Sequence, residues 1–468
     1  MNFTPLMISL VFGTSSLLLA GCNNDDGDTN SSSVINEAEL SAIDQSSWET
    51  RLSSYAEAEN LSLDEAKRRL DIMDSSSAAM TMASAYMKDS MGGAYFGMQE
   101  DNFSLNVLSN RVGELTALDQ EFLNRVQADT GVPLHMVMNS SHNLEQMDSF
   151  LDSISKDLST HNISNVTVSY NPESNKMIAN IYGEESNSDD YLNVKNSIIH
   201  NTFGKEVEFV YLSSDDLPTV DAAQPSPYIG PIVGGALLQH AGGSDNCTSG
   251  FAAYRYGVKG VLSAGHCSRG LGLQRFLTNT GEVYPLGSPT GNKALYMDLE
   301  FFPVTTSKPL SPRFYNDNQQ FIGVGVDRIA GPNDYLLNDW VCHSGRTSGQ
   351  AENGGVLNKR GESCGRITGT ERGTPVYGCN GWTSTQACEG RSFIVVSGKN
   401  GTNLRSYSGD SGGPWYKTTS SGEVIAMGIH SASSKTTIGE IYTTARFSPL
   451  YLAYDLGGIT IPTTRDYD

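Results

Sequence analysis

Glycine is distributed unevenly along this 468-residue chain, and the unevenness divides the chain near residue 225. Residues 1–225 contain 10 glycines, and residues 226–468 contain 38. Charge divides at the same place: the first stretch has 11 basic and 34 acidic side chains, the second 20 and 18. A chain this long forms two or three domains at roughly 100–200 residues each. We therefore expect an acidic front part (residues 22–225) and a near-neutral, glycine-rich back part (residues 226–468).

The N-terminus has the pattern of an export signal. Residues 7–20 form an apolar run that is short for a membrane-spanning helix, and it ends in Leu19-Ala20-Gly21-Cys22. A cysteine at this place resembles the bacterial lipoprotein signal, with residues 1–21 as signal peptide and Cys22 lipidated. No Lys or Arg precedes the run, so an ordinary secretory signal is the alternative. Both predict export, and the lipoprotein resemblance implies a bacterial cell and a precursor anchored in its membrane.

The cysteines other than Cys22 all lie in the back part. An exported protein meets an oxidising compartment, so these six residues are expected to form disulfides. Six cysteines allow 15 pairings, and the spacing alone does not choose among them. The chain has no Cys-x-x-Cys pair, which argues against a structural zinc site, and we expect no metal or cofactor. The six are Cys247, Cys267, Cys342, Cys364, Cys379 and Cys388.

The front part has the pattern of a mixed α+β domain. Helices are expected over residues 36–73 and 75–90, with a cap within residues 61–66. From residue 132 the order is strand, helix, two strands, helix and strand, which predicts a ferredoxin-like unit. We find no catalytic constellation in it. Residues 213–230 are rich in Asp, Ser and Pro, as in an exposed linker that is open to proteolysis.

Three segments of the back part carry residues suited to nucleophilic catalysis. A serine hydroxyl needs a neighbouring base, and the base needs a buried carboxylate that fixes its tautomer. The glycines beside Ser411 also let backbone N–H groups turn toward an oxyanion. Asp298 lies between apolar residues, as a buried carboxylate should, whereas Asp317, Asp327, Asp334 and Asp339 lie near turn-forming residues. The segments are residues 263–267 with His266, residues 295–299 with Asp298, and residues 409–414 with Ser411.

These segments resemble chymotrypsin-fold serine proteases, most closely the bacterial branch of alpha-lytic protease and the streptogrisins. Residues 232–235, 342–349 and 447–461 add to the resemblance, which covers about half of the chain. It implies an all-β, trypsin-like catalytic domain of two antiparallel six-stranded β-barrels at residues 226–468. It also implies that the α+β front part is a pro-domain that assists folding.

The resemblance implies a role for each site residue. Ser411 is the nucleophile, His266 the general base and acid, and Asp298 its orienter. The backbone N–H groups of Gly409 and Ser411 form the oxyanion hole. The disulfides are Cys247–Cys267 and Cys342–Cys364, whereas Cys379 and Cys388 have no counterparts in the family and are expected to form a local pair.

Substrate preference follows from the strand at residues 428–433. By resemblance, Ser431 contacts the substrate, and Ser408, His430 and Ser433 line the pocket for the residue before the scissile bond. This set is similar to that of glutamate-specific members, and two hydroxyls and an imidazole can donate hydrogen bonds to a carboxylate. Arg405 lies where trypsin-like members carry an Asp, which disfavours basic substrates. The alternative is that His430 is structural and the pocket takes apolar residues.

The sequence thus predicts an exported serine endopeptidase that cleaves protein or peptide substrates through an acyl-enzyme. It is made as a precursor whose partners are its own pro-domain and, through Cys22, the membrane. Cleavage in the linker would release the protease to the periplasm or the medium. The alternatives are a catalytically silent binding lipoprotein with a protease fold, and a front part that binds substrate independently. The net charge of −21 argues against nucleic acid as a partner.

Overall fold

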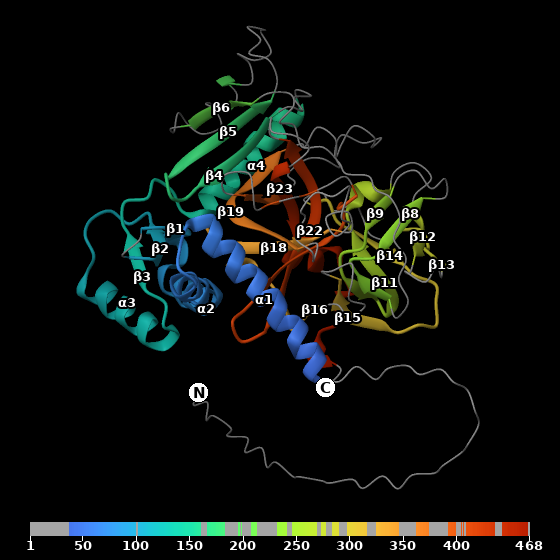
Figure 1. Cartoon of the computed structure of the whole chain (residues 1–468). Helices are drawn as coiled ribbons and strands as arrows, with labels where there is room; N and C mark the ends of the chain where they lie inside the picture. Colours follow the sequence, from blue (N-terminus) through green and yellow to red (C-terminus); the bar gives the residue numbers. More distant parts are fainter. Residues whose placement is uncertain are drawn as a thin grey trace, which may run out of the picture. The chain divides into compact units, whose positions relative to one another are not determined.

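The structure is a computed structural model (Figure 1). Cys22, Cys379, Cys388, Ser408 and the expected linker lie outside the residues that it describes. Among the described residues, no helix is long and apolar enough to cross a membrane. The described residues are 37–99, 102–160, 166–182, 195–196, 198, 207–212, 232–240, 246–268, 273–277, 283–289, 297–315, 324–345, 362–373, 392–398, 404, 406, 409–435 and 442–466.

The front part begins with two long helices, α1 (Glu37–Glu59) and α2 (Leu63–Met87). Ser62 caps α2, because its Oγ accepts a hydrogen bond of 3.2 Å from the backbone N–H of Glu65. The break between the helices falls at residues 60–62 instead of the expected residue 74. Asn60 causes it by taking a φ of 54°, outside the range of a right-handed helix.

The expectation of a ferredoxin-like unit is wrong. The strand expected first in that unit, β3 (Leu134–Val137), pairs in parallel with β2 (Ser104–Ser109), which pairs with β1 (Met91–Gly97). The sequence analysis assigned no strands to residues 91–109, and one of these strands, β2, pairs with β3. Helices α3 (Ala117–Thr130) and α4 (Leu144–Thr160) flank β3 in the sequence.

The later strands of the front part form a separate group. β4 (Val166–Asn171) and β5 (Lys176–Tyr182) make the expected hairpin, and β6 (Val207–Leu212) pairs in parallel with β5. Met147, Leu151 and Ile154 of α4 pack in one core with side chains of β4 and β5. The group therefore has a buried face of its own, with β4 and β6 as its outer strands.

The back part contains a closed six-stranded barrel. Its strands pair in the order β18 (Trp340–Ser344), β21 (Pro414–Thr418), β22 (Val424–Lys435), β23 (Tyr442–Pro449), β20 (Ser392–Ser397) and β19 (Glu362–Gly373). Pairing of β19 with β18 closes the ring. The interior is filled by apolar side chains that include Val341, Ile394, Trp415, Met427 and Phe447.

Strands that precede β18 in the sequence, together with one that follows β23, form three smaller sheets among the described residues. Together they enclose a second core that includes Ile232, Leu238, Val261, Phe276 and Phe302. A second closed barrel stays a prediction. The strands are β7 (Ile232–Gly234), β8 (Leu237–His240), β9 (Asn246–Thr248), β10 (Ala252–Arg255), β11 (Val258–Ser263), β12 (Leu273–Leu277), β13 (Val283–Pro285), β14 (Glu300–Pro303), β15 (Leu310–Phe314), β16 (Val324–Gly325) and β24 (Ile459–Thr460).

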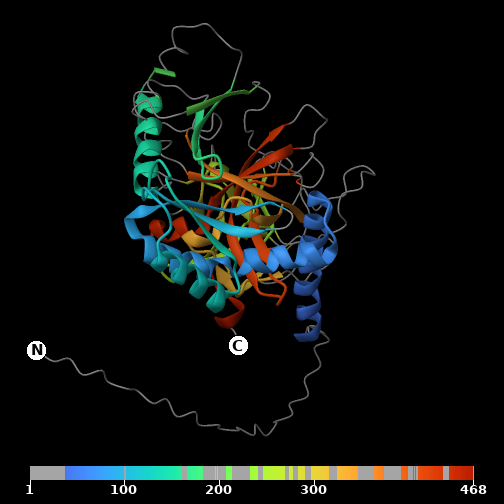
Figure 2. The same ribbon diagram turned by 90° about the vertical axis from the view of Figure 1, so that its left-hand side faces the viewer.

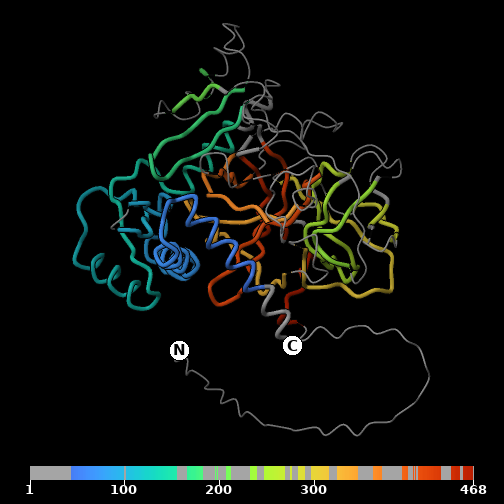
Figure 3. The backbone as a smooth tube through the Cα atoms, in the orientation of Figure 1, coloured from blue at the N-terminus to red at the C-terminus, as the bar shows by residue number. Residues whose placement is uncertain are grey.

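The front part joins the barrel through a shared sheet. β4 pairs antiparallel with the end of β19, from Thr370 opposite Tyr170 to Gly373 opposite Thr167, so β4, β5 and β6 extend the barrel wall (Figures 1 and 2). Arg446 of β23 donates to Glu371 of β19 at 2.7 Å and to Tyr182 of β5 at 2.9 Å. The chain can be followed from α1 in blue to β23 in red in Figure 3. Residues Glu37–Asp468 belong to one compact unit.

Candidate active site

His266 lies in η3 (Gly265–Ser268), a single 3₁₀ turn directly after β11. Two contacts to neighbouring segments hold the turn in place. The disulfide Cys247–Cys267 joins it to β9, and the hydroxyl of Ser263 donates to the backbone carbonyl of Thr248 at 2.8 Å. Such a short turn has little stability of its own, so these tertiary contacts fix where the imidazole points.

Asp298 lies two residues before β14, and its neighbours Met297 and Leu299 are buried. Its backbone N–H donates to the hydroxyl of Ser448 at 2.9 Å. One carboxylate oxygen, Oδ1, accepts the backbone N–H of His266 at 2.8 Å. Of the other aspartates between His266 and Ser411 in the sequence, Asp327, Asp334 and Asp339 have different partners, and Asp317 lies outside the described residues.

Ser411 lies in a tight turn before β21. Gly412 has a φ of 89°, and a Cβ there would lie 2.0 Å from Ser263 Oγ and 2.1 Å from the carbonyl oxygen of Thr248. Only glycine fits that position without a clash. Thr248 supports the turn: its backbone N–H donates to the Ser411 carbonyl at 2.7 Å, and its hydroxyl donates to the Gly409 carbonyl at 2.6 Å. Gly409, with a φ of 105°, and Ser411 thus share one turn.

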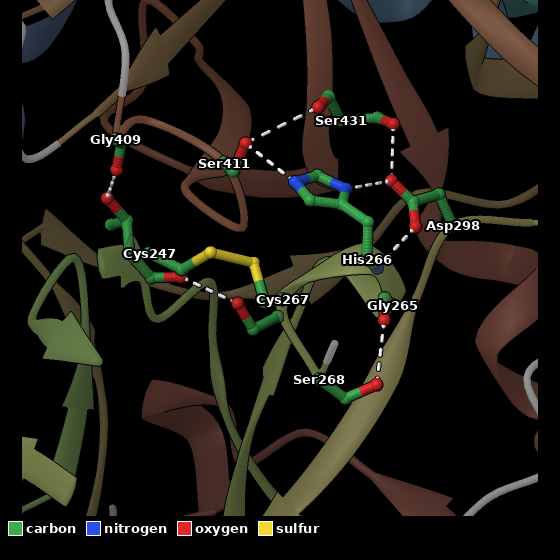
Figure 4. Close-up of a disulfide and its surroundings, with 11 residues drawn as sticks. Cys247, Gly265, His266, Cys267, Ser268, Asp298, Gly409, Ser411 and Ser431 are labelled. Atoms are coloured by element: carbon green, nitrogen blue, oxygen red, sulfur yellow. Dashed lines mark hydrogen bonds and ion pairs between the residues drawn. A yellow bond between two sulfur atoms is a disulfide. The ribbon is translucent and has the colours of Figure 1, made fainter. Parts of the chain in front are cut away.

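The three residues meet in one hydrogen-bonded line, which Figure 4 shows. Nδ1 of His266 lies 2.6 Å from Oδ2 of Asp298, and Nε2 lies 2.9 Å from Oγ of Ser411. The three residues are almost wholly buried, at 7%, 1% and 0% exposure for His266, Asp298 and Ser411. A carboxylate beside Nδ1 holds the proton on that nitrogen and leaves the lone pair of Nε2 facing the serine hydroxyl. This arrangement can activate Ser411 as a nucleophile.

Ser431 of β22 completes the line. Its hydroxyl donates to Asp298 Oδ2 at 2.5 Å, and its backbone carbonyl lies 3.5 Å from Ser411 Oγ (Figure 4). The expected contact of Ser431 with substrate stays a prediction, and its side chain contacts the carboxylate of Asp298. The reason is that β22 passes beside both Asp298 and Ser411.

A second buried polar group lies around His430, the residue before Ser431. Nε2 of His430 lies 2.9 Å from Ser406 Oγ and 3.3 Å from Ser433 Oγ, and Ser433 donates to Ser406 at 2.6 Å. Burial lowers the pKa of His430 to about 4, although the charge of Asp410 opposes the shift. The ring is therefore neutral at pH 7.

Ser406 is a residue that the sequence analysis missed. It lies two positions before Ser408 in the sequence, and side chains two apart in an extended segment point to the same face. Ser408 was selected by resemblance to the family, so alternation along the chain is the signal that could have pointed to Ser406. The structure brings His430 and Ser433 together with Ser406, and Ser408 lies outside the described residues.

Both disulfides that the resemblance implies are present. Cys342 and Cys364 are directly paired residues on β18 and β19, with Cα atoms 3.9 Å apart, and Cys247 and Cys267 have Cα atoms 6.3 Å apart. Within the described ranges, one group of three or more His, Cys, Asp or Glu side chains has its ligand atoms within 4.8 Å of one another, namely Cys247, His266 and Cys267. Two of these are disulfide sulfurs, which cannot act as thiolate ligands.

No protein-family model and no curated protein matches the chain. Solved structures similar to it include a glutamic-acid-specific serine protease described as using a histidine triad in substrate binding, at 20% identity over 49% of this chain and 100% of that one, with a TM-score of 0.34. Protease A of Thermobifida fusca matches at 20% identity, over 50% and 98%, and the chymotrypsin of Cellulomonas bogoriensis at 22%, over 50% and 99%, both with a TM-score of 0.33. TM-scores this low carry no weight for the activity of this chain.

Proposed function

We propose that this chain is an exported serine endopeptidase that hydrolyses peptide bonds in proteins or peptides through an acyl-enzyme. The observation that carries the proposal is the line from Asp298 through His266 to Ser411, with distances of 2.6 and 2.9 Å. It joins residues that are 32 and 145 positions apart in the sequence. A buried line of carboxylate, imidazole and hydroxyl is the arrangement that activates a serine.

Each residue has a definite part in the proposed reaction. Ser411 Oγ forms a bond to the carbonyl carbon of the scissile peptide while its proton passes to His266 Nε2. Asp298 stabilises the imidazolium, which then gives the proton to the leaving amine. Water then attacks the carbonyl carbon of the acyl-enzyme and passes a proton to His266 Nε2. The bond to Ser411 Oγ breaks, and His266 returns the proton to Ser411. The backbone N–H groups of Gly409 and Ser411 stabilise the oxyanion of each tetrahedral intermediate.

The pocket residues support a preference for Glu, or Asp, before the scissile bond. Ser406, His430 and Ser433 form a buried cluster of hydrogen-bonding groups, and Ser408 is proposed to join them. A carboxylate satisfies such groups with charge-assisted hydrogen bonds, whereas an apolar side chain leaves them unpaired. One observation favours the alternative of an apolar preference: both ring nitrogens of His430 already have protein partners. Peptides that differ only in Glu, Asp, Phe, Leu or Lys at that position decide between the two.

The front part is proposed as a pro-domain that assists folding of residues 226–468. Pairing of β4 with β19 supports a folding role, because the front part supplies an edge strand to which a barrel strand can hydrogen-bond. The 38 glycines of the back part also raise the entropy of its unfolded chain. Refolding of residues 226–468 alone should yield no activity, and residues 22–225 added in trans should restore it. Full activity without the front part would contradict a folding role.

Membrane anchoring through Cys22 is proposed for the precursor. Replacing Cys22 with Ser should move the exported precursor from the membrane fraction to the soluble fraction. A precursor that stays with the membrane after this change is held there by something other than a lipid on Cys22.

The activity itself is tested by active-site titration. A fluorophosphonate probe should label the full-length wild-type protein at Ser411, as located by mass spectrometry of its peptides. Ser411→Ala should take up no label and should lose hydrolysis of a protein substrate by about 10⁶-fold. Wild-type protein that binds peptides but neither labels nor cleaves would favour the silent binding lipoprotein.

A further inference from the structure

Trp415 and His430 make a side-chain hydrogen bond inside the barrel. Trp415 lies on β21 and His430 on the neighbouring strand β22, and the indole Nε1 lies 3.2 Å from Nδ1 of the imidazole. An indole N–H can only donate a hydrogen bond. Nδ1 of His430 must therefore accept it and carries no proton. A neutral imidazole has one N–H, which then lies on Nε2.

The other side of the ring faces hydroxyl groups. Nε2 of His430 lies 2.9 Å from Ser406 Oγ and 3.3 Å from Ser433 Oγ. A hydroxyl oxygen accepts the Nε2 proton in this arrangement. Hydrogen bonds thus run in one direction, from the indole to the imidazole and from the imidazole to the hydroxyls.

The surroundings hold both rings in place. The ring of Phe447 stacks on that of Trp415, with centroids 4.9 Å apart and planes 20° from parallel. The ring of His343 stacks on His430, with centroids 5.3 Å apart and planes 15° from parallel. Trp415, His343 and His430 are all fully buried. A fully buried indole that stacks on a neighbouring ring cannot turn its N–H elsewhere without disturbing the core.

We propose that Trp415 is a positioning residue for substrate selection: it holds His430 in the Nε2–H tautomer, whose proton the serine hydroxyls accept in the free protein and a substrate carboxylate accepts in their place. The opposite tautomer would offer a lone pair, which repels a carboxylate and accepts from an amide. The inference rests on the proposed function, and it concerns discrimination between Glu and Gln, which differ little in shape. The lowered pKa of His430 agrees with a ring that stays neutral.

The first test reads the tautomer directly and needs no catalysis. Long-range ¹H–¹⁵N spectra of ¹⁵N-histidine-labelled full-length protein at pH 7 distinguish the two neutral tautomers and the imidazolium, with His430→Gln used to assign the signal. We expect the Nε2–H form in the wild type. The Nδ1–H form or an imidazolium would overturn the inference, even if Trp415 variants fail to fold.

The second test measures the ratio of kcat/KM for two peptides that differ only in Glu or Gln before the scissile bond. Trp415→Phe keeps a ring in the core but removes the donor, and it should lower the Glu/Gln ratio by about 10- to 100-fold, the loss expected for one hydrogen bond to a charged group. Phe447→Leu disturbs the packing of the indole but keeps its N–H, and should keep the ratio. An unchanged ratio in Trp415→Phe, or an equal fall in both variants, would refute the inference. A wild type that cleaves neither peptide and takes up no fluorophosphonate would instead refute the proposed function.

Discussion

The hydroxyl of Ser431 donates a hydrogen bond of 2.5 Å to Oδ2 of Asp298, the same oxygen that lies 2.6 Å from His266 Nδ1. The other oxygen of that carboxylate accepts the backbone N–H of His266 at 2.8 Å. Three donors thus fix the carboxylate in the plane that the imidazole needs. The orientation of His266 is a property of this network and not of Asp298 alone.

Replacing Ser431 with Ala should lower kcat by about 10- to 100-fold, because one hydrogen bond to a charged group is lost. Replacing Asp298 with Asn should lower it by about 10⁴-fold through the wrong tautomer of His266. Hydrolysis rates normalised to fluorophosphonate-titratable sites measure both effects. Ser448→Ala is the matched control, since Ser448 contacts only the backbone N–H of Asp298 in the site. Equal rates in Ser431→Ala and the wild type would show that the hydroxyl does not orient the carboxylate.

The two disulfides should differ in their effect on activity. They close loops of similar length, with sequence separations of 20 and 22 residues, so loss of either should destabilise the protein by about 3 kcal/mol. Only Cys247–Cys267 holds the turn that carries His266. Replacing both of its cysteines with Ala should therefore lower kcat below that of the Cys342/Cys364 double variant. Urea midpoints and titrated kcat values measure the two effects, and equal kcat values would count against a positioning role.

Arg51 of α1 should be one of the most costly side chains to remove. It is fully buried, donates to the Trp340 and Thr418 carbonyls at 2.9 Å, and pairs with Asp74 at 2.8 Å. Arg51→Met leaves Asp74 buried without this partner, which should lower the free energy of unfolding by about 3–5 kcal/mol. Arg68→Met breaks an exposed ion pair with Glu65 and should cost about 1 kcal/mol or less. Similar urea midpoints for the two variants would contradict the prediction.

Asp44 should make the protein less stable as the pH rises from about 4 to 6. Burial raises the pKa of Asp44 from 3.8 to about 6, although Arg313 and the backbone N–H of Gly325 oppose the shift. The folded state therefore binds this proton more tightly than the unfolded state, and its stabilising effect is lost as the pH passes through the folded pKa. The loss is about 3 kcal/mol at most.

Asp44→Asn removes the titrating carboxyl group. The free energy of unfolding should therefore fall less with rising pH in the variant than in the wild type, by the amount that Asp44 contributes. Urea midpoints of the variant and the wild type are compared at pH 4, 5, 6 and 7. Subtracting one from the other at each pH cancels the contributions of the other carboxylates. Parallel curves for the variant and the wild type would show that Asp44 titrates normally in the folded state.

The sequence was enough to identify His266, Asp298 and Ser411 as candidate catalytic residues and to indicate several local features of the chain. Ser62 at the start of α2, the glycines around Ser411 and the apolar neighbours of Asp298 are signals carried by adjacent residues. Local backbone preference and local burial are physical properties of short segments, so they can be read before the fold is known.

The pairing of strands and the contacts between distant side chains depend on the folded structure. β3 pairs with β2 instead of its expected partners, and β4 joins the barrel at β19, 200 residues along the chain from Tyr170 to Thr370. Alternation along a strand identifies its buried face but carries no information on its neighbour at the edge. The contacts of Ser431 with Asp298 and of Trp415 with His430 depend on such pairings. They follow from the packing of strands and not from any property of the residues beside them in the sequence.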